Sequence, residues 1–267
     1  METKKVIVSE KTFEEMDLPE TIYKYRIWNE PFHKTIITKQ EVFFAAPTSF
    51  EDPLDCKNLI RYDLLTDEEI YSYYLKDSKE KHPERTRQQH RAYAREWSEK
   101  SPMKDKVYVK ERVEQDFKEY DERLGVLSLT ANPANEAMWI KYANNHDGFV
   151  IGFNPLIMFP HLGGGGAVTY YDELPIIRPR PWHSFEEQHN YQIFAKLSKW
   201  SFEEEYRTHI FRSGPLSLQD RTIKLPPKAI TKIIIGKNMP KESAENLLQS
   251  IPPELAHVQI ESEDELD

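Results

Sequence analysis

The residues best suited to chemistry lie in the stretch WSFEEEYRTHIF, residues 200–211, where three consecutive glutamates stand between aromatic residues. If this stretch is a strand, Glu203, Glu205 and Arg207 share one face and Glu204 points to the other. Two carboxylates on one buried face repel each other, which favours protonation of one while the other stays ionised. Such a pair suits a site where one carboxylate orients a hydroxyl group and the other handles a proton or a cation. If the stretch is a helix, the run of charge is an ordinary solvated face with an ion pair four residues apart.

A second group of polar residues forms the sequence YKYR, residues 23–26. In a strand, Lys24 and Arg26 share one face, and the two tyrosines share the other. The two cations could form a pocket wall for an anion such as a pyrophosphate, because a planar guanidinium fork matches phosphate oxygens. The alternative is an edge strand whose cations are solvated.

The turn TSFEDPLDC, residues 48–56, brings two aspartates close together in the sequence. Asp52 and Asp55 could cap the local backbone, or they could face a site as a pair of carboxylates. Cys56 could be a nucleophile, although small buried cysteines are commoner. The turn therefore has both a structural and a chemical interpretation.

Several familiar active-site motifs are absent. The sequence has no Gly-x-Ser-x-Gly elbow, no His-Glu-x-x-His helix, no dinucleotide-binding glycine fingerprint and no kinase motif set. The four glycines at 163–166 lack the Lys-Ser/Thr of a phosphate-binding loop and predict a flexible connection. His183 and His189 are six residues apart and do not neighbour each other on a helix, so metal ligation there is not favoured.

Composition and charge narrow the class of protein. The 267 residues carry a net charge of −9, which argues against non-specific attraction to nucleic acid or to an anionic membrane. A single cysteine excludes an intrachain disulfide. The N-terminus lacks the apolar core of a signal peptide, and no run is long enough to span a bilayer. We therefore expect a cytoplasmic protein without membrane contact.

The fold must hold these polar stretches together. Patterns of β-branched and aromatic residues predict strands at 21–28, 41–47, 125–133, 148–154, 167–173, 205–211, 230–238 and 257–262. Helices are predicted at 135–145, 184–200 and 240–251, and a charged insertion of two or three helices at 63–123, broken near Pro83 and Pro102. This interleaving, without linker or repeat, predicts a single α+β domain over residues 1–267 with a mixed sheet. The acidic residues 261–267 are expected to form a frayed tail.

Five stretches together carry a resemblance to a known family. They are YKYR at 23–26, FEDPLD at 50–55, MWIKYA at 138–143, GFVIGF at 148–153 and WSFEEEYR at 200–207. In this order they resemble the marks of the bacterial domain-of-unknown-function family 2971, and they span nearly the whole chain. Glu51 and Leu54 stand where that family has Asn and Phe.

The layout is also similar to the ADP-ribosyltransferase fold, with a basic first strand, a hydroxyl residue on a middle strand and a late Glu-x-Glu strand. This resemblance implies an NAD-dependent transferase that uses no metal and moves ADP-ribose to a macromolecular acceptor. It implies that Glu205 stabilises a ribosyl oxocarbenium ion and that Glu203 acts as a general base. The residues that it implies for NAD binding are Lys24, Tyr25, Arg26, Ser49, Asp52, Ser128, Thr130, Trp139, Tyr142 and Arg207.

Two other functions fit the same residues. A metal-dependent nuclease or phosphoesterase could take its oxygen ligands from four carboxylates, those of Asp52, Asp55, Glu203 and Glu205. A non-catalytic sensor or interaction module could use YKYR and EEEYR as a structural ion-pair network across neighbouring strands.

The acceptor of a transferase could dock on the basic segment 76–112, where 12 Lys and Arg stand against 7 Asp and Glu. Arg87, Arg91 and Arg95 share one face of a predicted helix there, and the acceptor could be RNA, DNA or an acidic protein. A solvated surface is the alternative. By analogy with transferases of this shape, the expected role is that of a toxin or phage-defence effector, with an inhibitory partner protein.

Overall fold

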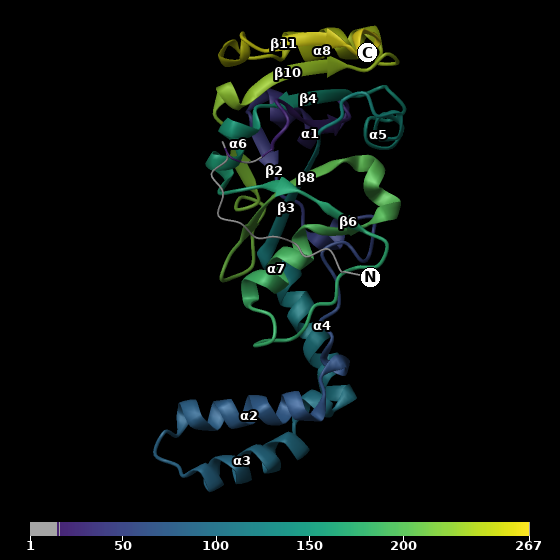
Figure 1. The fold of residues 1–267 in the computed structure, drawn as a ribbon. Coiled ribbons are helices and arrows are strands. Elements are labelled where there is room, and N and C mark those ends of the chain that lie inside the picture. Colours follow the sequence, from purple (N-terminus) through teal and green to yellow (C-terminus); the bar gives the residue numbers. More distant parts are fainter. Residues whose placement is uncertain (1–14, 16, 267) are drawn as a thin grey trace.

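A mixed seven-stranded sheet forms the centre of the structure, a computed structural model that describes residue 15 and residues 17–266 (Figure 1). The strand order is β11-β10-β4-β1-β3-β8-β5. Strands β10 and β11 are parallel, and the other neighbouring strands are antiparallel. The strands are β1 (Ile22–Arg26), β3 (Leu124–Thr130), β4 (Phe149–Phe153), β5 (Gly166–Ala167), β8 (Glu205–Phe211), β10 (Ile230–Ile235) and β11 (Gln259–Ser262). The fold class is therefore α+β, as the sequence predicts.

Both faces of the sheet are covered, and every residue of β4 is buried. On one face, α1 (Pro31–Thr38), α6 (Pro155–Leu162) and α8 (Lys241–Gln249) pack against Phe149, Ile151 and Phe153 of β4. On the other face, α5 (Glu136–Tyr142) packs against Val150 and the two tyrosines of β1. The alternation along β4 and β1 is that of strands buried on both sides.

Strands β1 and β3 pair at one position only, Tyr23 with Thr130. On their outer sides both are paired along their whole length, β1 with β4 and β3 with β8. Beyond Tyr23 the two strands therefore separate, and a gap opens in the sheet between Lys24–Arg26 and Val126–Leu129. A gap of this kind leaves backbone polar groups without a strand partner, so other polar groups must satisfy them.

The predicted charged insertion consists of three helices, α2 (Asp67–Lys81), α3 (Arg87–Glu99) and α4 (Lys106–Arg123), with breaks near the two prolines as predicted. Helices α2 and α3 each begin with a threonine capping box. They pack against each other through Ile70, Tyr74 and Ala94. Figure 1 shows this pair extending away from the sheet, to which α4 connects it. We call the pair the helical arm.

The prediction of one helix over 184–200 is wrong beyond Ile193. Helix α7 spans Phe185–Ile193, and the chain then forms the short strand β7 (Ala195–Leu197) and the 3-10 helix η4 (Ser198–Glu203). Strand β7 pairs in parallel with β6 (Thr169–Tyr171), and β2 (Glu41–Phe43) pairs with β9 (Thr222–Lys224). Pairing with a distant strand outweighs the local helical preference of this segment.

The tail expected to fray is instead folded as far as Leu266. Strand β11 continues into the 3-10 turn η7 (Glu263–Glu265), which Ser262 caps. Glu263 is buried, and its carboxylate lies 2.6 Å from His146 Nδ1. The sequence pattern misses this ordering because the partner of Glu263 lies more than a hundred residues away in the chain.

Candidate functional site

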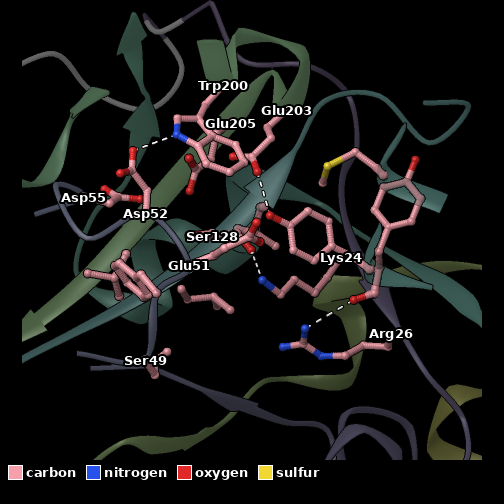
Figure 2. A pocket seen from close by; sticks show the side chains of 18 of the residues that line it. Lys24, Arg26, Ser49, Glu51, Asp52, Asp55, Ser128, Trp200, Glu203 and Glu205 are labelled. Carbon is pink, nitrogen blue, oxygen red and sulfur yellow. Dashed lines mark hydrogen bonds between the residues drawn. The ribbon is translucent and has the colours of Figure 1, made fainter. Parts of the chain in front are cut away.

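The gap between β1 and β3 is a cavity of about 490 Å³ (Figure 2). Its floor and one wall come from these two strands, and the loop of residues 49–55 closes one side. Helix α5, strand β7, η4 and the start of β8 supply the opposite wall. Figure 2 shows Lys24 and Arg26 apart from Glu203, Glu205 and Trp200, with Asp52 and Asp55 to one side.

The glutamate triplet is divided between two elements. Glu203 ends η4, Glu205 begins β8, and Glu204 between them has a left-handed backbone with φ 43°. This conformation redirects the chain, so that Glu203 and Glu205 both face the cavity while Glu204 is exposed and accepts a hydrogen bond from Asn132. The two glutamates converge as expected, but the prediction that they share a strand face is wrong for Glu203.

Lys196 lies between the carboxylates. Its ammonium nitrogen is 2.5 Å from Glu203 Oε2, 3.0 Å from Glu205 Oε2 and 3.5 Å from Asp55 Oδ2. The hydroxyl of Tyr142 donates to Glu203 Oε1 at 2.7 Å. Although burial opposes protonation of Lys196, the surrounding carboxylates raise its pKa. The sequence suggests that protonation of one glutamate relieves the repulsion between the two carboxylates. In the structure, the ammonium group of Lys196 relieves it instead.

Arg207 supports the acidic wall from behind. Its side chain is fully buried, and it donates two hydrogen bonds of 2.7 Å to Asp55 and others to Glu205 and to the Ile193 carbonyl. Burial disfavours ionisation of Glu205, but Arg207 and then Lys196 outweigh it and bring the Glu205 pKa to about 2. Glu205 is therefore a fixed anion at neutral pH.

The basic wall lies on β1. Lys24 Nζ donates to the carbonyl oxygen of Ser128, one of the backbone groups that the gap leaves without a strand partner. Burial and the neighbouring charge of Arg26 lower the pKa of Lys24 to about 7. Burial lowers the pKa of Arg26 to about 10, so its guanidinium stays charged at neutral pH.

An aromatic residue completes the wall next to the loop. The indole nitrogen of Trp200 donates to Asp52 Oδ2 at 2.7 Å, and Lys141 Nζ lies 4.0 Å from the centre of the indole ring. Lys141 also pairs with Glu51 at 2.8 Å. These contacts fix the loop of residues 49–55 against η4 and give the cavity one planar apolar surface.

Most of the residues predicted from sequence line the cavity. They are Lys24, Tyr25, Arg26, Ser49, Asp52, Ser128, Tyr142, Glu203 and Glu205. Three do not. Thr130 is buried at the position where β3 pairs with β1, Trp139 belongs to the core and donates to the Pro133 carbonyl, and Arg207 lies behind Glu205. These three side chains lie outside the lining of the cavity, and their part in NAD binding stays a prediction.

The sequence interpretation missed Lys196 and Trp200. Trp200 was visible at the start of the WSFEEEYR stretch, but Lys196 is one lysine among many, and its position depends on β7. Cys56, considered as a nucleophile, is buried and burial raises the pKa of its thiol, so its role is packing.

The proposed metal ligands are not arranged around an open space. Lys196 lies within 3.5 Å of Asp55, Glu203 and Glu205, where a divalent cation would have to sit. Among the described residues, the group of side chains spaced to hold a cation is elsewhere, at Glu136, His146 and Glu263. This geometry gives the nuclease alternative less support than the transferase.

Comparison with protein-family models, with curated proteins and with solved structures gave no match to this chain. The described part of the chain contains no helix both long and apolar enough to cross a membrane. The function must therefore be inferred from the geometry of the site itself.

Proposed function

We propose that this chain binds NAD in the cavity between β1 and β3, cleaves its glycosidic bond and transfers ADP-ribose to a macromolecular acceptor. The observation that carries the proposal is the arrangement of charges. A cationic wall, Lys24 and Arg26, lies in the same cavity as two buried glutamates, Glu203 and Glu205. This arrangement suits a substrate that has a pyrophosphate at one position and develops positive charge at another.

In the proposed reaction, the bond between the nicotinamide nitrogen and ribose C1 breaks, and neutral nicotinamide leaves with the bonding electrons. Ribose develops oxocarbenium character, as in glycoside hydrolysis. Glu205 stabilises this charge as a fixed anion, because its carboxylate needs no reorganisation. Glu203 takes the proton of the attacking acceptor group, and Tyr142 holds its carboxylate in position.

The charges behind the acidic wall support the same chemistry. Asp55, Glu203 and Glu205 stand against Lys196 and Arg207, which leaves this buried group with one negative charge in excess. An excess anion in a site shielded from water favours a developing cation.

The identity of the acceptor and the biological role belong to the proposal as well. We propose that the acceptor docks on the basic segment 76–112 and that the enzyme is a toxin or phage-defence effector restrained by an inhibitory partner protein. The supporting observation is that half of the cations of this segment lie on the helical arm, which extends away from the sheet (Figure 1).

Nicotinamide release from NAD tests the proposal. We expect release by the native chain without added metal, and at least a hundredfold loss in Glu205→Gln, since removal of one such electrostatic group typically costs about 10²- to 10³-fold. Glu204→Gln is the matched control, because this neighbouring glutamate is exposed and lies outside the cavity. It should release nicotinamide at the native rate.

Thermal melting separates catalysis from folding. Glutamine keeps the size of Glu205, and Arg207 keeps both of its hydrogen bonds to Asp55, so Glu205→Gln should remain folded. A folded variant with native activity would disprove the role of Glu205. Hydrolysis of a phosphodiester substrate only with Mg²⁺ or Mn²⁺ would establish the nuclease alternative instead.

A further inference from the structure

A second cavity lies at the end of β3 and β8 away from the first, where Leu124 pairs with Phe211. It lies between α4 and α7, and its volume is about 230 Å³, the space of about eight water molecules. Among the described residues, it shares no lining residue with the cavity between β1 and β3. Nothing in the proposed transferase reaction uses it.

The walls of this second cavity combine aromatic and charged side chains. Four rings line it, those of Phe117, Tyr120, Phe185 and Phe211. The Phe211 ring centre lies 5.5 Å from that of Tyr120 and 5.8 Å from that of Phe185. Phe185 is 47% exposed, although it is a large apolar side chain on a folded helix. A planar apolar ligand would cover this ring and gain the packing that it lacks.

Three arginines stand around the aromatic walls: Arg112, Arg123 and Arg180. Arg112 is neutralised by Asp116 at 3.0 Å. Arg123 donates through Nε to the Arg212 carbonyl and lies over the Phe211 ring, so its terminal nitrogens stay available. In the part of the chain that the structure describes, no carboxylate pairs with Arg123 or Arg180. Two guanidinium groups are therefore available to an anion, and they stand against one further lining carboxylate, that of Glu119, which accepts a hydrogen bond from Gln115.

A chain of hydrogen bonds adds a further donor. His209 Nε2 lies 3.0 Å from His189 Nε2, and His189 Nδ1 lies 2.9 Å from the Tyr120 hydroxyl. Burial lowers the pKa of both histidines to about 4, so both rings are neutral at neutral pH.

Among the residues that the structure describes, the buried His209 Nδ1 has no hydrogen-bond partner, and this favours one arrangement of the ring protons. Because a buried N–H group without a partner is rarer than a buried acceptor without one, we assign the proton of His209 to Nε2. His209 then donates to His189, and His189 donates to the Tyr120 oxygen. The Tyr120 hydroxyl proton is left free to be donated into the cavity.

We propose that the second cavity binds a small aromatic carboxylate. Its ring lies against Phe185 and Phe211, and its carboxylate accepts hydrogen bonds from Arg123, Arg180 and the Tyr120 hydroxyl. This site is independent of the transferase proposal, because it shares neither its lining residues nor its chemistry.

Calorimetric titration of the full chain with 1-naphthoate tests this site. We expect saturable binding with one site per chain, and much weaker binding of the uncharged 1-naphthamide. Arg180→Gln should weaken 1-naphthoate binding about tenfold, because it removes one charge-assisted hydrogen bond. Arg91→Gln is the matched control, since Arg91 is also an exposed arginine but lies on the helical arm, away from the cavity. It should bind as the native chain does.

The proposal is overturned by an absence of saturable binding, by equal affinity for the amide, or by native affinity in Arg180→Gln. Phe185→Ala gives a second check, because loss of the ring should weaken both naphthalene compounds alike. The same titration of Glu205→Gln should give native affinity, so that failure of the transferase proposal and failure of this one are told apart.

Discussion

At the scale of single residues, the candidate site depends on buried charges that balance one another. Arg207 is fully buried and bonds to Asp55 and Glu205, while Lys196 bonds to Glu203 and Glu205. A buried charge that loses its partner typically costs about 3 to 5 kcal/mol. Each of these charged side chains is therefore stabilised by its oppositely charged partners. The acidic wall of the cavity is in this way organised before a substrate binds.

Lys24 is the cavity residue whose charge changes near neutral pH, because burial and Arg26 lower its pKa to about 7. Its ammonium is present below this pH and lost above it, so we expect the affinity for NAD to decrease as the pH rises. Between about pH 6 and about pH 8 the charged fraction falls about tenfold, and the dissociation constant of NAD, measured by calorimetry, should rise by a similar factor.

Lys24→Arg is the control for this pH dependence. An arginine keeps its charge over the whole range, so NAD affinity should vary little with pH in this variant. The neighbouring side chains of His33 and Arg26 do not change charge between about pH 6 and about pH 8, because burial lowers the pKa of His33 to about 4 and that of Arg26 to about 10. A native affinity that is constant with pH would show that Lys24 does not contact the ligand.

At the scale of elements, local patterns predicted most strands and helices, but not the feature that makes the site. Alternation located β1 and β8. The gap between β1 and β3 depends on which strands pair and where they stop pairing, which a local pattern does not contain. Lys196 was missed for the same reason, because β7 exists only through its pairing with β6.

The exposed arginines of the helical arm allow a test of where the acceptor docks. On α3, Arg87, Arg91 and Arg95 are exposed, and none of them forms an ion pair with another described residue. If the acceptor is a nucleic acid, these arginines meet its phosphates first. Changing all three to Gln should weaken binding of a short labelled RNA and lower the salt dependence by about three phosphate contacts, as measured by fluorescence anisotropy at several salt concentrations.

Three lysines provide the matched control, each paired with an acid four residues away: Lys76 and Lys81 on the arm, and Lys100 directly after α3. Replacing these three lysines by Gln removes the same total charge as the triple arginine variant. The lysines, however, are already paired with carboxylates. It should affect RNA binding much less. Equal effects of the two triple variants would indicate non-specific attraction, and no effect of either would mean that the acceptor docks elsewhere.

At the scale of the whole molecule, α7 connects the two cavities. Its residue His189 lines the second cavity, and its last residue, Ile193, accepts a hydrogen bond from Arg207 behind the first. The strand that follows carries Lys196 into the acidic wall. Each cavity thus lies against a part of one continuous segment, and both lie along the β3–β8 pair, which is hydrogen-bonded over its full length.

The C-terminal segment also bears on the site, because it closes over α5. Glu263 accepts a hydrogen bond from the Lys237 backbone N–H at 3.0 Å and contacts His146, whose ring stacks on Trp139 of α5. Tyr142, the partner of Glu203, lies on the same helix. The order of the tail therefore contributes to the order of the acidic wall.

Glu263→Ala should test this contribution. It removes a buried carboxylate and its hydrogen bonds, so we expect the free energy of unfolding in urea to fall by about 2 kcal/mol. Asp264→Ala is the control, because the neighbouring side chain is exposed and its loss should change stability by less than about 0.5 kcal/mol. If the two variants unfold at the same urea concentration, Glu263 does not anchor the segment, and other contacts hold α5 in place, such as its packing against Tyr25 and Val150.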